Sequence, residues 1–293
     1  MDFTTLEIFA SVAELGSVTR AAERLGRAPS NVTTRLQQLE EHLGAALFLR
    51  DGKRMALTAE GRTYLEFAHH ILSLGAEARA ALTPEIPTGR LVIGAMESTA
   101  ASRLPAPLAA FHQRWPQVDL DLRTGTSRAL VEGVLAHRID CAFVARLPGE
   151  SGHDPCAVPG LDATTAFSEE LILVLPQDHP AVRTADDLQV SRLAALEEGC
   201  SYRRFVEIWL ARSGTRQHVA RNLELRSYHA IIACVAAGGC FAVVPRSVID
   251  LQGAGANVTL HPLAAVDTLF IRRRGFRSAA CDAFLAAVLD RAA

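Results

Sequence analysis

Five of the six side chains between residues 30 and 35 can form hydrogen bonds. They are Ser30, Asn31, Thr33, Thr34 and Arg35. Hydroxyl, amide and guanidinium groups of this kind can bind base edges or phosphates in a DNA groove, and threonine methyls can contact the methyl group of thymine. The arginine can reach a guanine or the backbone. This short stretch is therefore a candidate for reading nucleic acid.

Positive charge follows this stretch, although the chain as a whole is not basic. The 293 residues carry a net charge of −2. Arg50, Lys53 and Arg54 nevertheless stand together against only Asp51 within residues 50–54. A local basic face is what phosphate contact requires, and such charges supply affinity with little sequence preference. We expect these three residues to contact phosphates or the minor groove.

Three short helices are predicted to position the hydrogen-bonding residues. The third begins at Pro29, whose fixed φ suits a first helical position. Its apolar residues step by four, three and four from Val32 to Leu43, which makes one buried stripe. Ser17 can cap the second helix. Ser17 and Thr19 then lie at a helix start, where a phosphate is favoured.

A hairpin is predicted after the helices. The segment LFLRDGKRMALT contains two extended pieces around Asp51-Gly52, which is a hairpin signal. Helices and a basic hairpin in this order predict a winged helix-turn-helix over residues 1–58, with the third helix entering the major groove N-terminus first. The alternative is an ordinary three-helix cluster with a solvated polar face.

A long helix is predicted from Thr58 to about Leu82. Its apolar residues alternate steps of three and four over nearly three heptads, which favours a partner helix. They are Tyr64, Phe67, Ile71, Leu74, Ala78 and Ala81. Two prolines and a glycine in TPEIPTG then mark a hinge. Residues 59–87 are therefore expected to form a dimerising linker.

From Arg90 the pattern changes to alternating strands and helices. RLVIGA, VDLDLR and IDCAFVA are separated by a polar turn, MESTAAS, and by helical segments, which predicts a βαβαβ unit with a parallel sheet. EELILVLP begins a second such unit. Two α/β lobes joined by crossing strands would form a cleft where the loops at the strand ends meet. Lobe I is expected over about 88–160 and 266–293, and lobe II over about 161–265.

Polar residues follow the strand ends and helix starts that would face this cleft. They are Glu97, Ser98, Thr99, Thr126, Ser127, Ser201, Tyr202, Arg203 and Tyr228. Ser98 and Thr99 open a helix, where backbone N–H groups favour an anionic ligand group. Glu97 can instead neutralise an amine, or it can hold Arg103 or Arg203 in place. The residues alone do not choose between these roles.

Several other classes of protein are disfavoured by what the sequence does not contain. No nucleotide-binding glycine loop, zinc-protease motif or nucleophile elbow appears, so no catalytic residue, cofactor or metal is expected. No apolar run approaches the ~20 residues of a membrane span, and the N-terminus has no secretory pattern. A cytoplasmic protein without a membrane partner is expected.

Two further sets of residues have ordinary structural interpretations. The six cysteines lack zinc-ligand spacing and are expected to be reduced thiols, mostly in the core. Cys200, in a polar loop, is the candidate for reactivity. The run Arg272-Arg273-Arg274 is interpreted as a solvated edge rather than a DNA-binding patch.

Four segments in a fixed order resemble the LysR-type transcriptional regulators along the full chain. They are SVTRAAERLG, QLEEHLGAALFLR, LTAEG and HRIDCAFV. The resemblance implies a winged helix-turn-helix, a dimerising linker helix and, over residues 88–293, a two-lobed effector domain similar to periplasmic binding proteins. It also implies promoter DNA and a small-molecule effector as partners, and a homodimer or homotetramer.

The effector domain also resembles that of the putrescine-utilisation regulators within this family. ESTAASRLP, CSYRR, SYHAIIACVAAGG and VVPRS carry that likeness. It implies a similar cleft, with an amine as one candidate ligand, but does not fix the ligand, because one changed side chain can swap specificity. The competing hypothesis is a cytoplasmic binding protein or enzyme that uses the α/β cleft.

Overall fold

The computed structural model describes residues 2–51, 54–80, 86–148, 154–212, 221–253 and 257–290. The chain divides into two compact units, one made chiefly of residues 1–84 and the other of residues 85–135 and 139–293. None of the helices within the described ranges is long and apolar enough to cross a membrane.

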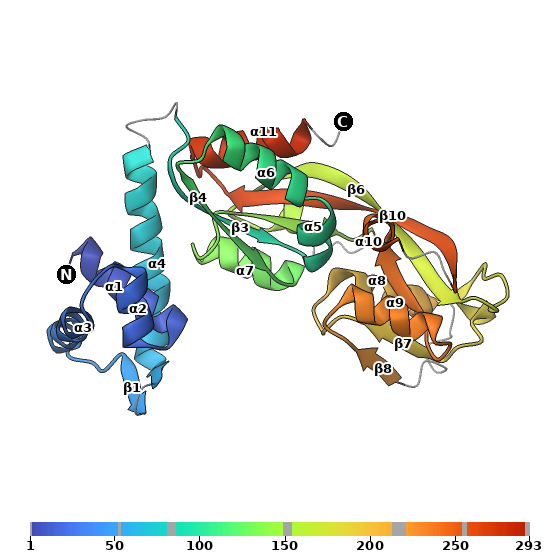
Figure 1. Cartoon of the computed structure of the whole chain (residues 1–293), viewed down its shortest axis with the longest axis horizontal. Coiled ribbons are helices and arrows are strands. Elements are labelled where there is room, and N and C mark those ends of the chain that lie inside the picture. Colours follow the sequence, from blue (N-terminus) through green and yellow to red (C-terminus); the bar gives the residue numbers. More distant parts are fainter. Residues whose placement is uncertain are drawn as a thin grey trace. The chain divides into compact units, whose positions relative to one another are not determined.

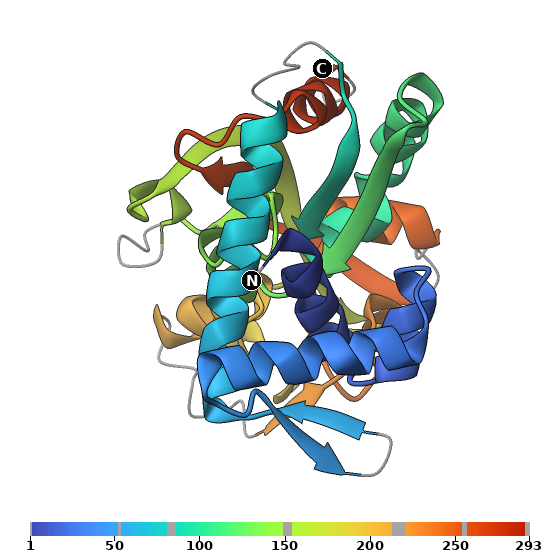
Figure 2. The ribbon, with the colours of Figure 1, turned by 90° about the vertical axis from the view of Figure 1, so that its left-hand side faces the viewer.

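The first unit contains four helices and one hairpin among its described residues (Figure 1). The elements are α1 (Phe3–Leu15), α2 (Val18–Arg24), α3 (Pro29–Leu43), β1 (Phe48–Asp51), β2 (Arg54–Leu57) and α4 (Ala59–Ala80). The order and bounds agree closely with the predicted winged helix-turn-helix. In Figure 2 the β1–β2 hairpin projects from the lower edge of this unit.

Local signals explain where these helices start and stop. Asp2 and Ser17 cap α1 and α2 by accepting a hydrogen bond from a backbone N–H three residues on. Pro29 occupies the first turn of α3. Gly16 and Gly44 end α1 and α3 in the left-handed conformation, with φ of 61° and 65°, which glycine adopts at no steric cost.

The core of this unit joins all of its helices. Phe9 of α1 lies at its centre, 5.4 Å from the Phe48 ring and 5.1 Å from the Tyr64 ring between centroids. The predicted stripe on α3 is buried through Val32, Leu36 and Leu39, packed in the same cluster. The stripe therefore seats α3 and turns its polar residues away from the core.

Helix α4 presents two different faces. Tyr64, predicted for the partner seam, is partly buried and packs against Phe9 in the core of its own chain. Phe67 and Leu74 remain 61% and 60% exposed, and Ile71 36%. These three residues, spaced by four and three, leave one apolar face of α4 uncovered within the described part of the chain.

The second unit is built on a six-stranded sheet of order β4-β3-β5-β10-β6-β9 and a two-stranded sheet β7-β8. Its strands are β3 (Gly89–Ala95), β4 (Val118–Thr124), β5 (Cys141–Arg146), β6 (Leu161–Pro176), β7 (Arg192–Ala195), β8 (Arg221–Glu224), β9 (Ala242–Pro245) and β10 (Val258–Arg273). Its helices are α5 (Glu97–Ser102), α6 (Pro105–Arg114), α7 (Ser127–Leu135), α8 (Ser201–Arg212), α9 (Tyr228–Ala236), α10 (Arg246–Gln252) and α11 (Ala279–Leu289), with short 3-10 turns at Pro155–Ala157 and Ala185–Asp187.

Two long antiparallel strands, β6 and β10, join two lobes (Figure 1). One end of the pair extends the parallel β4-β3-β5 sheet of lobe I. The other end pairs with β9 in lobe II. Each strand is continuous over 16 residues. The chain therefore passes from one lobe to the other within each of these strands.

Alternating residues of β6 attach a helix to each face of lobe II. Leu171 and Leu173 pack in one cluster with Val206 of α8, whereas Ile172 and Val174 pack in another with α9 and α10. In lobe I, α6 and α11 cover one face, where Phe111 and Phe284 meet edge to face at 5.6 Å. A strand buried on both faces reads as a continuous apolar run, which explains EELILVLP.

One sequence expectation in this unit is wrong and another holds only in part. The polar turn predicted at MESTAAS is the short helix α5, and Pro105 starts a separate helix α6. The arginine run is a solvated edge only in part: Arg274 is exposed and Arg272 partly exposed, but Arg273 is 7% exposed and donates to the carbonyls of Val134 and Ile139. Buried carbonyls need such donors, so Arg273 supports the interior of the unit.

Candidate nucleic-acid interface and ligand cavity

The start of α3 presents an exposed polar face. Pro29, Ser30, Asn31 and Thr34 are all exposed. The predicted stripe is buried on the opposite side of the helix, so these polar side chains face solvent. A helix that offers hydroxyl and amide groups from its first turns has the chemistry to read a major groove.

Thr33 and Arg35 are tied to their own chain, unlike their neighbours. The Thr33 hydroxyl donates to the Pro29 carbonyl over 3.0 Å. Arg35 donates from Nη1 to Asp2 Oδ2 over 2.8 Å and to the Thr5 hydroxyl over 3.3 Å. The Thr33 hydroxyl hydrogen is therefore already used in a hydrogen bond within α3, and the Arg35 side chain connects α3 to the start of α1.

The remaining candidates for phosphate contact lie at the second helix and the hairpin. Thr19 is exposed, and the Ser17 hydroxyl already accepts from the Arg20 N–H over 3.4 Å. Arg54 is exposed on β2. Arg50 lies in β1, but its side chain is outside the described part, and Lys53 lies outside the described residues altogether.

A cavity of about 260 Å³ lies between the lobes of the second unit. It is lined by Met96, Glu97, Ser98, Thr124, Gly125, Thr126, Ser127, Leu196, Glu197, Cys200, Ser201, Tyr202, Leu225, Arg226 and Tyr228. Seven of the nine residues predicted for the cleft are among them. Lobe I contributes the ends of β3 and β4 with the starts of α5 and α7, and lobe II contributes the starts of α8 and α9.

Glu97 is a half-buried carboxylate on the wall of this cavity. Its Oε2 is buried and has no hydrogen-bond partner among the described residues. Burial raises the pKa of this carboxyl above its ordinary value, because desolvation disfavours the charged form. A buried acceptor without a donor is uncommon in folded proteins. The Glu97 carboxylate is thus available to a ligand that carries N–H or O–H groups.

The arginines considered as partners of Glu97 are engaged elsewhere. Arg103 forms an ion pair of 2.5 Å with the buried Glu169. Arg203 pairs with Glu207 at 3.1 Å and with Glu224 at 2.9 Å. Neither arginine contacts Glu97 within the described residues, and Arg203 does not line the cavity. The structure therefore does not bring Arg203 together with the other predicted cleft residues.

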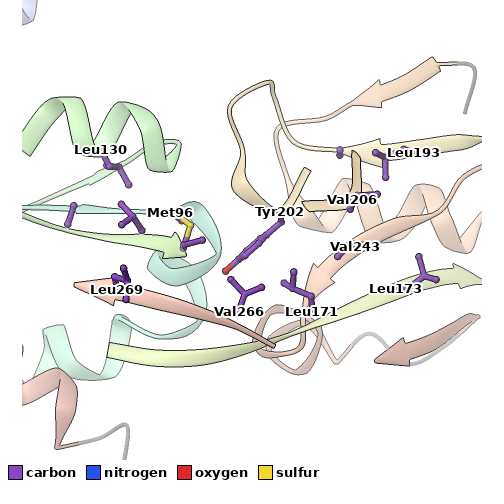
Figure 3. Packing of buried hydrophobic residues seen from close by; sticks show 14 of the residues in the cluster. Met96, Leu130, Leu171, Leu173, Leu193, Tyr202, Val206, Val243, Val266 and Leu269 are labelled. Atoms are coloured by element: carbon purple, nitrogen blue, oxygen red, sulfur yellow. The ribbon is translucent and has the colours of Figure 1, made fainter. Parts of the chain in front are cut away.

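Two tyrosines from lobe II line the cavity. Tyr202 is 2% and Tyr228 4% exposed. Burial raises the pKa of both hydroxyls, so both remain protonated. The Tyr202 hydroxyl has no hydrogen-bond partner in the described structure. Figure 3 shows the Tyr202 ring extending from α8 across to Met96 of lobe I.

Serines join the two lobes directly at the cavity. The Ser201 hydroxyl donates to the Ser127 hydroxyl over 2.8 Å, and Ser127 also accepts from the Ala145 N–H over 3.2 Å. The Thr126 hydroxyl accepts from Ala129 N–H at the start of α7. Thr99 is 1% exposed and does not line the cavity, which removes it from the predicted lining.

Sequence reasoning missed several lining residues. Met96, Thr124 and Gly125 directly precede or follow predicted residues at strand ends, so extending each predicted turn by two residues would have found them. Glu197, Leu225 and Arg226 follow β7 and β8, two short strands without a clear apolar pattern. Their strands had to be known before the residues could be placed.

Cys200 lines the cavity as a protonated thiol. Burial raises its pKa above the ordinary value, and the thiol is a much weaker nucleophile than the thiolate. Its environment therefore opposes the reactivity expected from its polar loop. Within the described ranges, no group of three His, Cys, Asp or Glu residues is placed to hold a metal ion.

Two family models match the chain in series. The model "Bacterial regulatory helix-turn-helix protein, lysR family" matches residues 3–62. The model "LysR substrate binding domain" matches residues 85–293. The first covers α1 to the start of α4, and the second covers the unit that holds the cavity.

Curated relatives and solved structures match over nearly the whole chain. YusT of Bacillus subtilis (strain 168), an uncharacterized HTH-type transcriptional regulator, is 37% identical over 97% of this chain and 94% of its own length. GltR of the same organism, an HTH-type transcriptional regulator, is 33% identical over 99% and 97%. Full-length CbnR in complex with its target DNA is 26% identical, with a TM-score of 0.66 over 100% of both chains.

Proposed function

The chain belongs to the LysR family of ligand-responsive, DNA-binding transcriptional regulators, and from this premise we propose that it controls genes for handling a small amine. The alternative of an enzyme is set aside, since the matched families and relatives are transcriptional regulators. A protein that binds promoter DNA would act in the cytoplasm, and the proposal includes that location.

The DNA-binding part of the proposal assigns base contacts to the start of α3. Ser30, Asn31 and Thr34 are exposed there, and the basic hairpin adds phosphate contacts through Arg54. The target-bound CbnR structure supports this assignment through its similarity over the full chain. Thr33 is left with a weaker role, because its hydroxyl already donates to Pro29.

Fluorescence anisotropy with the protein's own upstream DNA tests the assignment. Thr34→Ala should weaken binding to that DNA but hardly change binding to a scrambled duplex. Thr63→Ala is the matched control, because Thr63 is an exposed threonine on α4 whose loss removes the same atoms. Equal affinity of Thr34→Ala and wild type for the upstream DNA would contradict the assignment.

Self-association is assigned to the uncovered face of α4. Phe67, Ile71 and Leu74 form this face, with Phe67 and Leu74 more than half exposed. Exposed apolar residues at heptad spacing are covered by a second helix in coiled coils, so two copies of α4 are expected to pair. A dimer suits an operator made of two half-sites. Both a homodimer and a homotetramer built from such dimers fit this face.

The effector is proposed to carry a primary ammonium group. The observation that carries this is the buried Glu97 oxygen without a partner on the cavity wall. An ammonium supplies three N–H donors, and the Tyr202 hydroxyl offers a second unused oxygen at the same cavity. Aromatic rings beside a carboxylate also favour a cation. The resemblance to putrescine-utilisation regulators supports the same class of ligand.

Isothermal titration calorimetry with four small molecules tests this class. Putrescine and butylamine carry ammonium groups, 1,4-butanediol has the length of putrescine without charge, and succinate carries the opposite charge. Binding of the amines without binding of the diol or succinate is expected. Binding of succinate alone would refute the cationic class and leave the cavity to an anionic effector.

A further inference from the structure

The Arg35 guanidinium is held on one side only. Both of its hydrogen bonds leave from Nη1, to Asp2 Oδ2 and Thr5 Oγ1. These partners lie at the start of α1, whereas Arg35 lies in the middle of α3. A guanidinium has five N–H donors, of which Nη1 carries two. The edge formed by Nε and Nη2 therefore makes no hydrogen bond within the described residues.

The holding group is itself fixed in place. Asp2 is the N-cap of α1, and its Oδ1 accepts from the Thr5 N–H over 2.7 Å and from the Thr5 hydroxyl over 2.8 Å. One carboxylate oxygen thus serves the cap and the other serves Arg35. Hydrogen bonds from Thr5, and then from Arg35, lower the pKa of Asp2 to about 2. The carboxylate stays ionised at any pH at which the protein would work.

We propose that Asp2 and Thr5 are positioning residues for DNA reading, which hold Nη1 of Arg35 so that its Nε–Nη2 edge faces the nucleic acid. Two parallel N–H donors match the O6 and N7 acceptors of guanine or two oxygens of a phosphate. An arginine already restricted in the unbound protein loses less side-chain entropy on binding. The inference rests on the proposed function, since it requires the start of α3 to enter a groove.

Two simpler roles for Asp2 give different outcomes. Asp2 could only stabilise α1 as a cap, or its negative charge could only oppose DNA. Asp2→Asn distinguishes the proposed positioning role from capping alone, because asparagine is an equally good N-cap but no longer offers Arg35 a charged acceptor. Glu7→Gln distinguishes the positioning role from simple repulsion of DNA, because it removes one negative charge from an exposed position of the same helix.

The test is a double-mutant cycle measured by fluorescence anisotropy. The quantity is the ratio of affinities for the protein's own upstream DNA and for a scrambled duplex of equal length. Asp2→Asn should lower this ratio about fivefold, as expected for two residues in direct contact. Asp2→Asn added to Arg35→Ala should cause no further loss, and Glu7→Gln should leave the ratio unchanged.

Three results would overturn the inference. The first is an unchanged affinity ratio in Asp2→Asn. The second is an equal loss of this ratio when Asp2→Asn is added to Arg35→Ala. The third is the same loss in Glu7→Gln. If the wild type itself shows no preference for its own upstream DNA, the proposed DNA target fails instead. The positioning of Arg35 by Asp2 is then tested by ¹⁵N relaxation of the Arg35 Nε–H bond, which should become more mobile in Asp2→Asn. Unchanged mobility would remove Asp2 as the positioning residue.

Discussion

Replacing Glu97 by glutamine should have two opposite effects, on ligand binding and on the stability of the ligand-free protein. The substitution keeps the shape of the side chain and removes its charge. A hydrogen bond to a charged group contributes about 1.5–3 kcal/mol, which corresponds to a loss of amine affinity of roughly 10- to 150-fold. The loss should appear in calorimetry with putrescine or butylamine.

The stability effect follows from the direction of the Glu97 pKa. Burial raises this pKa above its ordinary value of 4.5, so the folded state binds the proton more readily than the unfolded state does. Folding is then favoured below pH 4.5 and loses this advantage as the pH rises through the raised pKa. At pH 7 the charged carboxylate destabilises the ligand-free fold, and Glu97→Gln should therefore raise the stability of the ligand-free protein.

The expected gain in stability is small because Glu97 is only half-buried. It should stay below about 1 kcal/mol, or roughly 2–4 °C in melting temperature, and should vanish near pH 4. Glu197→Gln is the matched control, since Glu197 is an exposed acid at the same cavity. Unchanged amine affinity in Glu97→Gln would refute Glu97 as the anchor, and a stability gain as large at pH 4 as at pH 7 would refute the burial argument.

Four further predictions concern the first unit. Thr34→Ala should weaken binding to the protein's own upstream DNA by about 1–3 kcal/mol, while Arg54→Ala should lower the slope of log affinity against log salt by about 0.9 and leave sequence preference nearly unchanged. Phe67→Glu should shift analytical ultracentrifugation profiles toward the monomer, because it places a charge on the uncovered face of α4; an unchanged oligomer would place the contact elsewhere. Gly61→Ala should lower the melting temperature, because an added Cβ would lie 2.1 Å from the Leu47 carbonyl oxygen; a rise, as expected from helix propensity alone, would contradict that close approach.

The first unit could be predicted almost completely from local signals. Capping by Ser17, the Pro29 start and the Val32 stripe act within a few residues, so their pattern is visible in the sequence. Tyr64 shows the limit of this approach. It continues the heptad pattern of Phe67, and only the position of Phe9 across the fold decides that Tyr64 packs against the core of its own chain.

The cavity could be predicted in outline because parallel strands place their carboxyl ends at one edge. Ser98, Ser127 and Tyr202 lie where that rule puts them. The pairing of charges could not be predicted, since it depends on contacts between residues far apart in the chain. Arg103 meets Glu169, 66 positions away, and Arg203 meets Glu224. These two arginines are therefore paired with acids other than Glu97, which favours the amine alternative for the role of Glu97, although Arg226 lines the same cavity.

The most direct test of a ligand-responsive regulator measures DNA binding and ligand binding together. DNase I footprints and anisotropy titrations on the protein's own upstream DNA would be recorded with and without putrescine, for the wild type and for Glu97→Gln. We predict that putrescine changes the footprint or the affinity of the wild type, and that Glu97→Gln binds the same DNA in its absence but does not respond to it. Identical footprints and affinities of the wild type with and without putrescine, at concentrations where calorimetry shows the cavity occupied, would contradict the account.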